Sequence, residues 1–310
     1  MDNKRKTELL GEIGFTRTMK NSDHAALRAI ARGDLVRISS AFVCRRSTFQ
    51  ELKRHEREWL RAWAVGNSVR KAVLGGRSAA RIIGMPVLAT TKEDVELIPA
   101  TGKRPSTSKW PSGCVYVGGS YRVDEFETVD GLRVTAEIRT GIDIAIRNGF
   151  REGLVAMDWL LGRHPRANVQ FEIARLGRRK GIGWARAALA HAVGNVRSPY
   201  ESYARAILIQ NRIGPIRVNA PVGKFEVDML IGDRVVSEID GDVKYDGATY
   251  GRTDDVLRKE RVREKRLLND GYLVRRHSPS DVLNNEAQYV GDIRAACALA
   301  AIGAPVTQPT

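Results

Sequence analysis

Apolar and polar residues follow two different periods along the first 50 residues of the chain. A spacing of three to four predicts helices over residues 8–15 and 24–32. Alternation of apolar and polar residues then predicts a short hairpin formed by residues 35–38 and 41–43. Because this order of elements is typical of a small winged helix, we expect such a module over residues 1–50.

The middle of the chain mixes the helical and the alternating pattern. Helical periods occupy residues 50–66 and 75–88, and the second of these stops at Gly84 and Pro86. Strands are predicted at 94–98, 115–117 and 132–134, and helices at 139–148, 150–161, 168–175 and 182–193. This mixture predicts an α+β module over residues 51–197.

A helix, a hairpin, a strongly charged helix, a strand and a last helix follow in residues 198–310. The charged helix is predicted over residues 250–269, the strand over 272–277 and the last helix over 287–301. Alternation of strands and helices predicts a sheet flanked by helices. The fold class that we expect for the whole chain is therefore α/β, with several domains.

The predicted hairpin carries acidic residues inside its apolar strands. A three-residue loop at 232–234, with Gly at a position that tolerates positive φ, would place Asp228 directly opposite Glu238. Asp240 follows two residues farther along the same face. Like charges at this spacing lower stability unless a cation lies between them, and oxygen ligands suit Mg²⁺. The alternative is a solvated hairpin face, and the spacing leaves both interpretations open.

Net charge is distributed unevenly along the chain. Residues 198–310 contain 16 Lys and Arg and 16 Asp and Glu, so the first 197 residues carry the whole net charge of +15. A basic region of this kind favours a polyanionic partner. No amphipathic anchor indicates a membrane surface, and DNA is therefore the partner we expect.

The basic residues of the predicted winged helix are the first candidates for contacts with DNA. Arg28, Arg32 and Arg37 are spaced along its second helix and its first hairpin strand, where they could contact phosphates. The alternative is that they are scattered, solvated arginines.

Three features of the sequence lead us to expect a cytoplasmic protein. No apolar run approaches 20 residues, which predicts that no segment spans a membrane. The N-terminus has no apolar signal-peptide core. Three widely spaced cysteines predict neither a disulfide framework nor a zinc site.

The start of the helix after residue 197 has a recognisable cap. Ser198 is placed as N-cap, Pro199 occupies the first helical position, and Glu201 can reach back to the N-cap backbone. Glu201 either caps the helix only, or caps it and also supports the acidic site.

The motif formed by Asp228 and the run Glu238-Ile239-Asp240-Gly241 resembles the core of the PD-(D/E)XK nuclease superfamily. With Ser198-Pro199-Tyr200-Glu201 upstream and Lys244-Tyr245 downstream, it is similar to very-short-patch-repair-like endonuclease domains. Asp240 replaces the lysine of the wider superfamily, so the general base is not assigned to a lysine at that position.

This resemblance implies a metal-dependent endonuclease domain over residues 198–310, with Mg²⁺ or Mn²⁺ as cofactor. Asp228 and Glu238 would bind the metal, and Asp240 would bind it or orient the attacking water. Lys244 would stabilise the pentacovalent phosphate, and Glu201 would hold a metal-bound water.

Earlier segments resemble AbiEi-type antitoxin modules. The similarity rests on the run ALRAIARGDLVRISSAFV and on the segment Ser78-Ala79-Ala80 with Gly84 and Pro86 after it. Two functions are consistent with both resemblances. One is a DNA endonuclease with DNA-binding N-terminal modules; the other is an antitoxin-like transcriptional repressor with a catalytically silent nuclease-like domain. A cognate toxin or a phage or host protein is a further possible partner.

Overall fold

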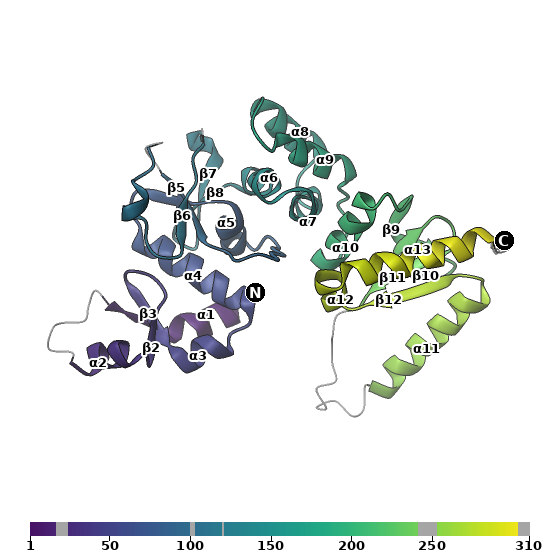
Figure 1. Ribbon diagram of the computed structural model, residues 1–310, viewed down its shortest axis with the longest axis horizontal. Coiled ribbons are helices and arrows are strands. Elements are labelled where there is room, and N and C mark those ends of the chain that lie inside the picture. The colour runs from purple at the N-terminus through teal and green to yellow at the C-terminus, as the bar shows by residue number, and fades with distance from the viewer. Residues whose placement is uncertain (17–23, 100–102, 120, 241–252, 303–310) are drawn as a thin grey trace. The chain divides into compact units, whose positions relative to one another are not determined.

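Helices and mixed sheets build the computed structural model of the chain, which confirms the α/β class (Figure 1). The described residues are 1–16, 24–99, 103–119, 121–240 and 253–302. None of the helices within these ranges is long and apolar enough to cross a membrane.

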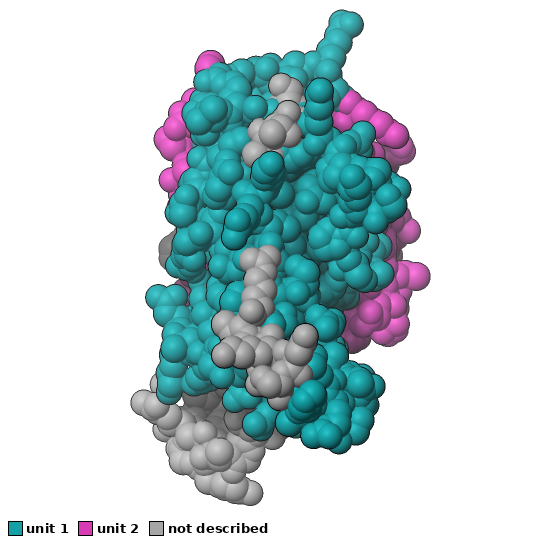
Figure 2. Space-filling model, turned by 90° about the vertical axis from the view of Figure 1, so that its left-hand side faces the viewer, with its two compact units in different colours: residues 1–147, 172–179 teal, residues 148–171, 180–310 magenta. Residues whose placement is uncertain are grey.

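The chain divides into two compact units, which Figure 2 shows in different colours. Unit 1 comprises residues 1–147 and 172–179, and unit 2 comprises residues 148–171 and 180–310. No described sheet is shared between the units, so each unit is described by itself.

Unit 1 opens with a three-stranded antiparallel sheet in the order β1–β3–β2. Its elements are α1 (Asn3–Gly11), β1 (Ile13–Phe15), α2 (His24–Arg32), β2 (Leu35–Arg37), β3 (Phe42–Arg45) and α3 (Arg46–Glu51). The helix over 24–32 and the hairpin after it are confirmed. The helix predicted over 8–15 is wrong in its second half, because Ile13–Phe15 pairs with β3. The helix instead begins earlier, where the Asp2 carboxylate accepts the Arg5 amide at 2.7 Å.

A five-stranded sheet in the order β6–β5–β4–β8–β7 forms the rest of unit 1. Its elements are α4 (Arg54–Ser68), β4 (Ala72–Leu74), α5 (Gly76–Ile83), β5 (Val95–Pro99), β6 (Cys114–Tyr116), β7 (Phe126–Val129), β8 (Leu132–Thr135) and α6 (Glu137–Asn148). The helix predicted from residue 50 begins only at Arg54, because Leu52 is extended and buried. Gly84 ends α5 in the left-handed conformation, with φ of 85°, as the sequence predicts. Trp59 and Leu60 of α4 pack into the core beneath the strands.

Four helices begin unit 2, and α8 contributes residues to both units. They are α7 (Phe150–Leu161), α8 (Arg166–Arg175), α9 (Ile182–His191) and α10 (Pro199–Gln210). A buried ion pair joins α7 to α10: Arg205 Nη2 lies 2.7 Å from both carboxylate oxygens of Asp158. This pair fixes the helix that carries Glu201.

A four-stranded mixed sheet completes unit 2, in the order β12–β11–β10–β9. Its elements are β9 (Ile216–Val222), β10 (Phe225–Ile231), β11 (Val235–Ile239), α11 (Thr253–Asn269), β12 (Leu273–His277), α12 (Pro279–Asn284) and α13 (Glu286–Ile302). β11 and β12 are parallel, and the other neighbours are antiparallel. Leu267 of α11 packs with Leu230 and Val236, while α13 runs along β11 and β12 (Figure 1).

Candidate active site

The hairpin of β10 and β11 has the register that the sequence predicts. Ile231 pairs with Val235 and Met229 pairs with Ser237, which leaves a three-residue loop that starts at Gly232. Gly232 adopts φ of 58°, the left-handed conformation expected for the turn. The next residues along the two strands are Asp228 and Glu238, so the hairpin brings these carboxylates together.

Glu238 is the most deeply buried acid of the hairpin, with 2% of its surface exposed. Arg263 of α11 donates a hydrogen bond to its Oε1, and donates another to the carbonyl oxygen of Glu226 at 3.0 Å. Arg276 Nε lies 3.2 Å from Glu238 Oε2, although that oxygen accepts no hydrogen bond from the described residues. Two arginines therefore neutralise this carboxylate in the protein without a bound cation.

Asp228 and Asp240 flank Glu238 in different environments. Asp228 is half-buried, and its Oδ2 accepts the Ile239 amide at 2.9 Å. The side chain of Asp240 is 62% exposed and lies 3.7 Å from Arg276 Nε. Lys244, the fourth predicted residue of the hairpin region, lies outside the described residues.

Glu201 joins this group from the first turn of α10. The Ser198 hydroxyl caps the helix by accepting the Tyr200 amide at 3.2 Å, and the Glu201 carboxylate accepts the Arg197 amide at 3.3 Å. Burial, and then the charge of Asp228, raise the pKa of Glu201 to about 7. Glu201 is thus a helix cap that also interacts electrostatically with the hairpin acids.

The acidic group is electrostatically strained as it stands. Burial raises the pKa of Asp228, and the charge of Asp240 raises it further, while the Ile239 amide opposes the change. Burial raises the pKa of Glu238 in the same direction, against the two arginines. A bound cation would relieve this strain, because it favours the charged form of every carboxylate near it.

The donors of this group fit a hard divalent cation by their chemistry, since they are all carboxylate oxygens. Across the described part of the chain, no group of three His, Cys, Asp or Glu side chains has an arrangement that could hold a metal ion as it stands. Binding would therefore require the cation to take the place of the arginine contacts on Glu238. Oε2 of that residue accepts no hydrogen bond from the described residues, so an exchange there would displace only the ion pair with Arg276.

The three arginines predicted to contact DNA all lie in unit 1. Arg28 and Arg32 are exposed on α2, and Arg37 is exposed on β2. Arg32 Nε donates to Asp34 at 3.0 Å in a solvent-exposed ion pair. Their exposure leaves them accessible to a polyanion.

Arg263 and Arg276 are site residues that the sequence analysis did not assign. Arg276 is the register partner of Glu238 across the parallel pair of β11 and β12. The order strand, helix, strand in this segment is the signal that could have placed the two strands side by side. Arg263 reaches the site because α11 covers the face of the sheet on which Val236 and Glu238 lie.

Comparisons with protein-family models and with curated proteins identify no relative. No protein-family model matches the chain, and no curated protein matches it significantly. The resemblance to nuclease and antitoxin modules therefore stays a prediction from the motifs.

Replacing Glu201 by glutamine should change how stability depends on pH. Between its ordinary pKa of 4.5 and about 7, the folded protein keeps a proton on Glu201 that the unfolded chain releases. Stability from this group is complete below pH 4.5 and is lost as pH rises through about 7. The free energy of unfolding of Glu201→Gln should exceed that of wild type by up to about 3 kcal/mol at pH 8, and by little at pH 4.5.

Urea unfolding with EDTA present, at pH 4.5, 6 and 8, measures this difference. Glu226→Gln is a matched control, because it removes a carboxylate that is 43% exposed from the same sheet. A Glu201→Gln gain that is equal at all three pH values would contradict the expected proton uptake.

Proposed function

We propose that the protein is a metal-dependent DNA endonuclease whose active site is the acidic group of β10, β11 and α10. The observation that supports this best is the gathering of Glu201, Asp228, Glu238 and Asp240 around one hairpin end, with raised pKa values at the first three. Such a group costs stability in the absence of a cation, and a purely structural hairpin has no need of it.

The proposed chemistry is hydrolysis of a phosphodiester bond. A bound Mg²⁺ or Mn²⁺ would polarise the scissile phosphate and lower the pKa of a bound water. Asp228 and Glu238 would hold the cation, and Asp240 would hold it or orient the water. Glu201 would hold a metal-bound water beside them, as the motif implies.

The remaining roles belong to cationic side chains. Lys244 would stabilise charge on the phosphate, as the motif implies. Arg263 and Arg276, once a cation occupies Glu238, would be released to contact phosphate oxygens, for which guanidinium groups are well shaped. We further propose that the helices and small sheet of residues 1–50 form a winged helix that holds the DNA.

The test is incubation of the full chain with supercoiled, linear and single-stranded DNA, with Mg²⁺, with Mn²⁺ or with EDTA. We expect nicking or cutting of at least one substrate that depends on the added metal and stops with EDTA. Failure on every substrate with both metals would refute the proposal.

The arginine contacts on Glu238 favour a second candidate, a DNA-binding regulator with a silent nuclease-like domain. Arg263 and Arg276 already neutralise Glu238, so the hairpin can be held together without a metal. Salt-sensitive DNA binding without cleavage, and no shift of the melting temperature on addition of Mg²⁺ or Mn²⁺, would support the regulator instead.

A further inference from the structure

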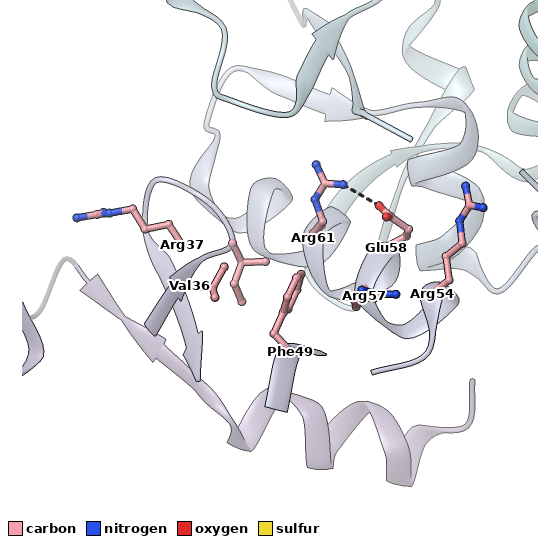
Figure 3. A pocket seen from close by; sticks show the side chains of 8 residues that line it. Val36, Arg37, Phe49, Arg54, Arg57, Glu58 and Arg61 are labelled. Atoms are coloured by element: carbon pink, nitrogen blue, oxygen red, sulfur yellow. Dashed lines mark hydrogen bonds and ion pairs between the residues drawn. The ribbon is translucent and has the colours of Figure 1, made fainter. Parts of the chain in front are cut away.

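A basic pocket of about 400 Å³ lies in unit 1, away from the acidic residues of β10 and β11 in the sequence and in a different compact unit. It is bounded by β2, by α3 and by one side of α4 (Figure 3). Its charged lining consists of four arginines and one glutamate: Arg37, Arg54, Arg57, Arg61 and Glu58. This excess of positive charge, in a pocket of nucleotide size, suits an anionic ligand.

The arginines of the pocket differ in how far the protein already uses them. Arg61 is structural, because it donates to Glu58 at 3.0 Å and to the carbonyl oxygens of Glu93 and Gly113 at 3.1 and 3.3 Å. Arg54 donates to the Thr91 carbonyl oxygen.

Arg57 and Arg37 have a different character. Neither guanidinium forms a hydrogen bond or an ion pair with any residue that the structure describes. Arg57 is half-buried on α4, whereas Arg37 is exposed and extends outward from β2, away from the α4 arginines (Figure 3). The two unused cations therefore suit an extended anion with more than one charge, such as a strand with successive phosphates.

The opposite wall of the pocket is apolar. Phe49 of α3 is half-buried, and it stands between Val36 and the α4 arginines (Figure 3). Ile38 is a further apolar residue of the lining. An aromatic ring next to unpaired cations is the combination by which proteins bind single-stranded nucleic acid, because the ring packs against a base while the cations contact phosphates. A duplex hides its bases, so it would use the cations but not the ring.

We propose that this pocket binds one nucleotide of a single-stranded nucleic acid, with its base against Phe49 and its phosphates on Arg57 and Arg37. The inference deepens the proposed DNA-binding role of the N-terminal region, and it does not depend on catalysis. Its test is a binding measurement, so its failure can be told apart from failure of the acidic site.

The experiment measures fluorescence anisotropy of a labelled 12-nucleotide single strand with the full chain and EDTA. Arg57→Gln should weaken binding about tenfold and reduce the salt dependence of binding. Phe49→Leu keeps an apolar residue in the core but removes the ring, and should also weaken binding about tenfold. Arg133→Gln is the matched control: it removes one exposed arginine of unit 1 outside the pocket, and should change affinity less than about twofold.

Further arms identify the ligand. The affinities for DNA and RNA strands are both measured, and the tighter-binding strand is the kind that the pocket prefers. Arg57→Gln should also weaken binding of a duplex of the same sequence, whereas Phe49→Leu should not. The proposal is overturned if Arg57→Gln binds the strand as tightly as Arg133→Gln. It is also overturned if Phe49→Leu, shown by circular dichroism to be folded, binds like wild type, or if free nucleotide monophosphate binds as tightly as the strand.

Discussion

Glu238→Gln should reduce metal-dependent DNA cleavage by at least about a hundredfold. The substitution keeps the size of the side chain and removes the charge that a divalent cation needs. It also replaces an acceptor for Arg263 with a neutral one, which is tolerable because the side chains of Arg263 and Arg276 are 20% and 28% exposed and can turn to water. The measurement is the initial rate of nicking at saturating Mg²⁺ or Mn²⁺.

A second measurement separates metal binding from activity. Addition of Mg²⁺ or Mn²⁺ should raise the melting temperature of wild type, since a ligand that binds only the folded state stabilises it, and Glu238→Gln should lose most of this increase. Glu226→Gln is the control, because Glu226 lies on the neighbouring strand with a 43% exposed side chain. Equal nicking rates for wild type and Glu238→Gln would show that Glu238 takes no part in the cleavage reaction.

The hairpin shows how much of the site a sequence can specify. Side chains alternate between the two faces of a strand, which decides which residues share a face. Gly232 sets the position of the turn, so the register of Asp228 and Glu238 follows from local chemistry. The Ser-Pro start of α10 is equally local, since the Ser198 hydroxyl and the amide that it accepts are two residues apart. Features of this kind need no knowledge of distant contacts.

The charge balance of the site could not be predicted in the same way. Arg263 and Arg276 reach Glu238 from 25 and 38 residues farther along the chain, and only the parallel pairing of β11 with β12 brings Arg276 there. The acids alone suggest an open metal site, whereas in the structure two arginines already neutralise Glu238, the most deeply buried of these acids. The spacing of the α4 arginines in the sequence places them on one helix face. That Phe49 lines the same pocket could not be predicted, because it depends on the change of chain direction at Leu52.

The errors in the fold have the same origin. Ile13–Phe15 fits a helical pattern, but pairing with β3 outweighs that local preference. The sequence analysis does not predict β4 and β7, strands of three and four residues, although it predicts β6 and β8, which are equally short. Alternation over so few positions does not separate strands from loops consistently.

Asp158→Ala should lower the free energy of unfolding of unit 2 by about 3–5 kcal/mol, because it leaves the buried guanidinium of Arg205 without its partner. Both side chains are at most 5% exposed, and an arginine cannot escape by losing its proton. Arg205→Met should cost less, since Asp158, whose pKa burial already raises, can take up a proton instead.

The double variant Asp158→Leu with Arg205→Met tests this asymmetry. It should be more stable than Asp158→Ala, although the Val193 amide and the His191 carbonyl oxygen lose their partners at a cost of about 1–3 kcal/mol each. Urea unfolding at pH 5 and pH 8 measures all four proteins. Without the arginine, the pKa of Asp158 should rise further above its ordinary 3.8, so Arg205→Met should lose stability as pH rises from 3.8 through that raised pKa. Equal losses for Asp158→Ala and Arg205→Met at both pH values would show that the cost comes from lost packing between α7 and α10, and not from a stranded charge.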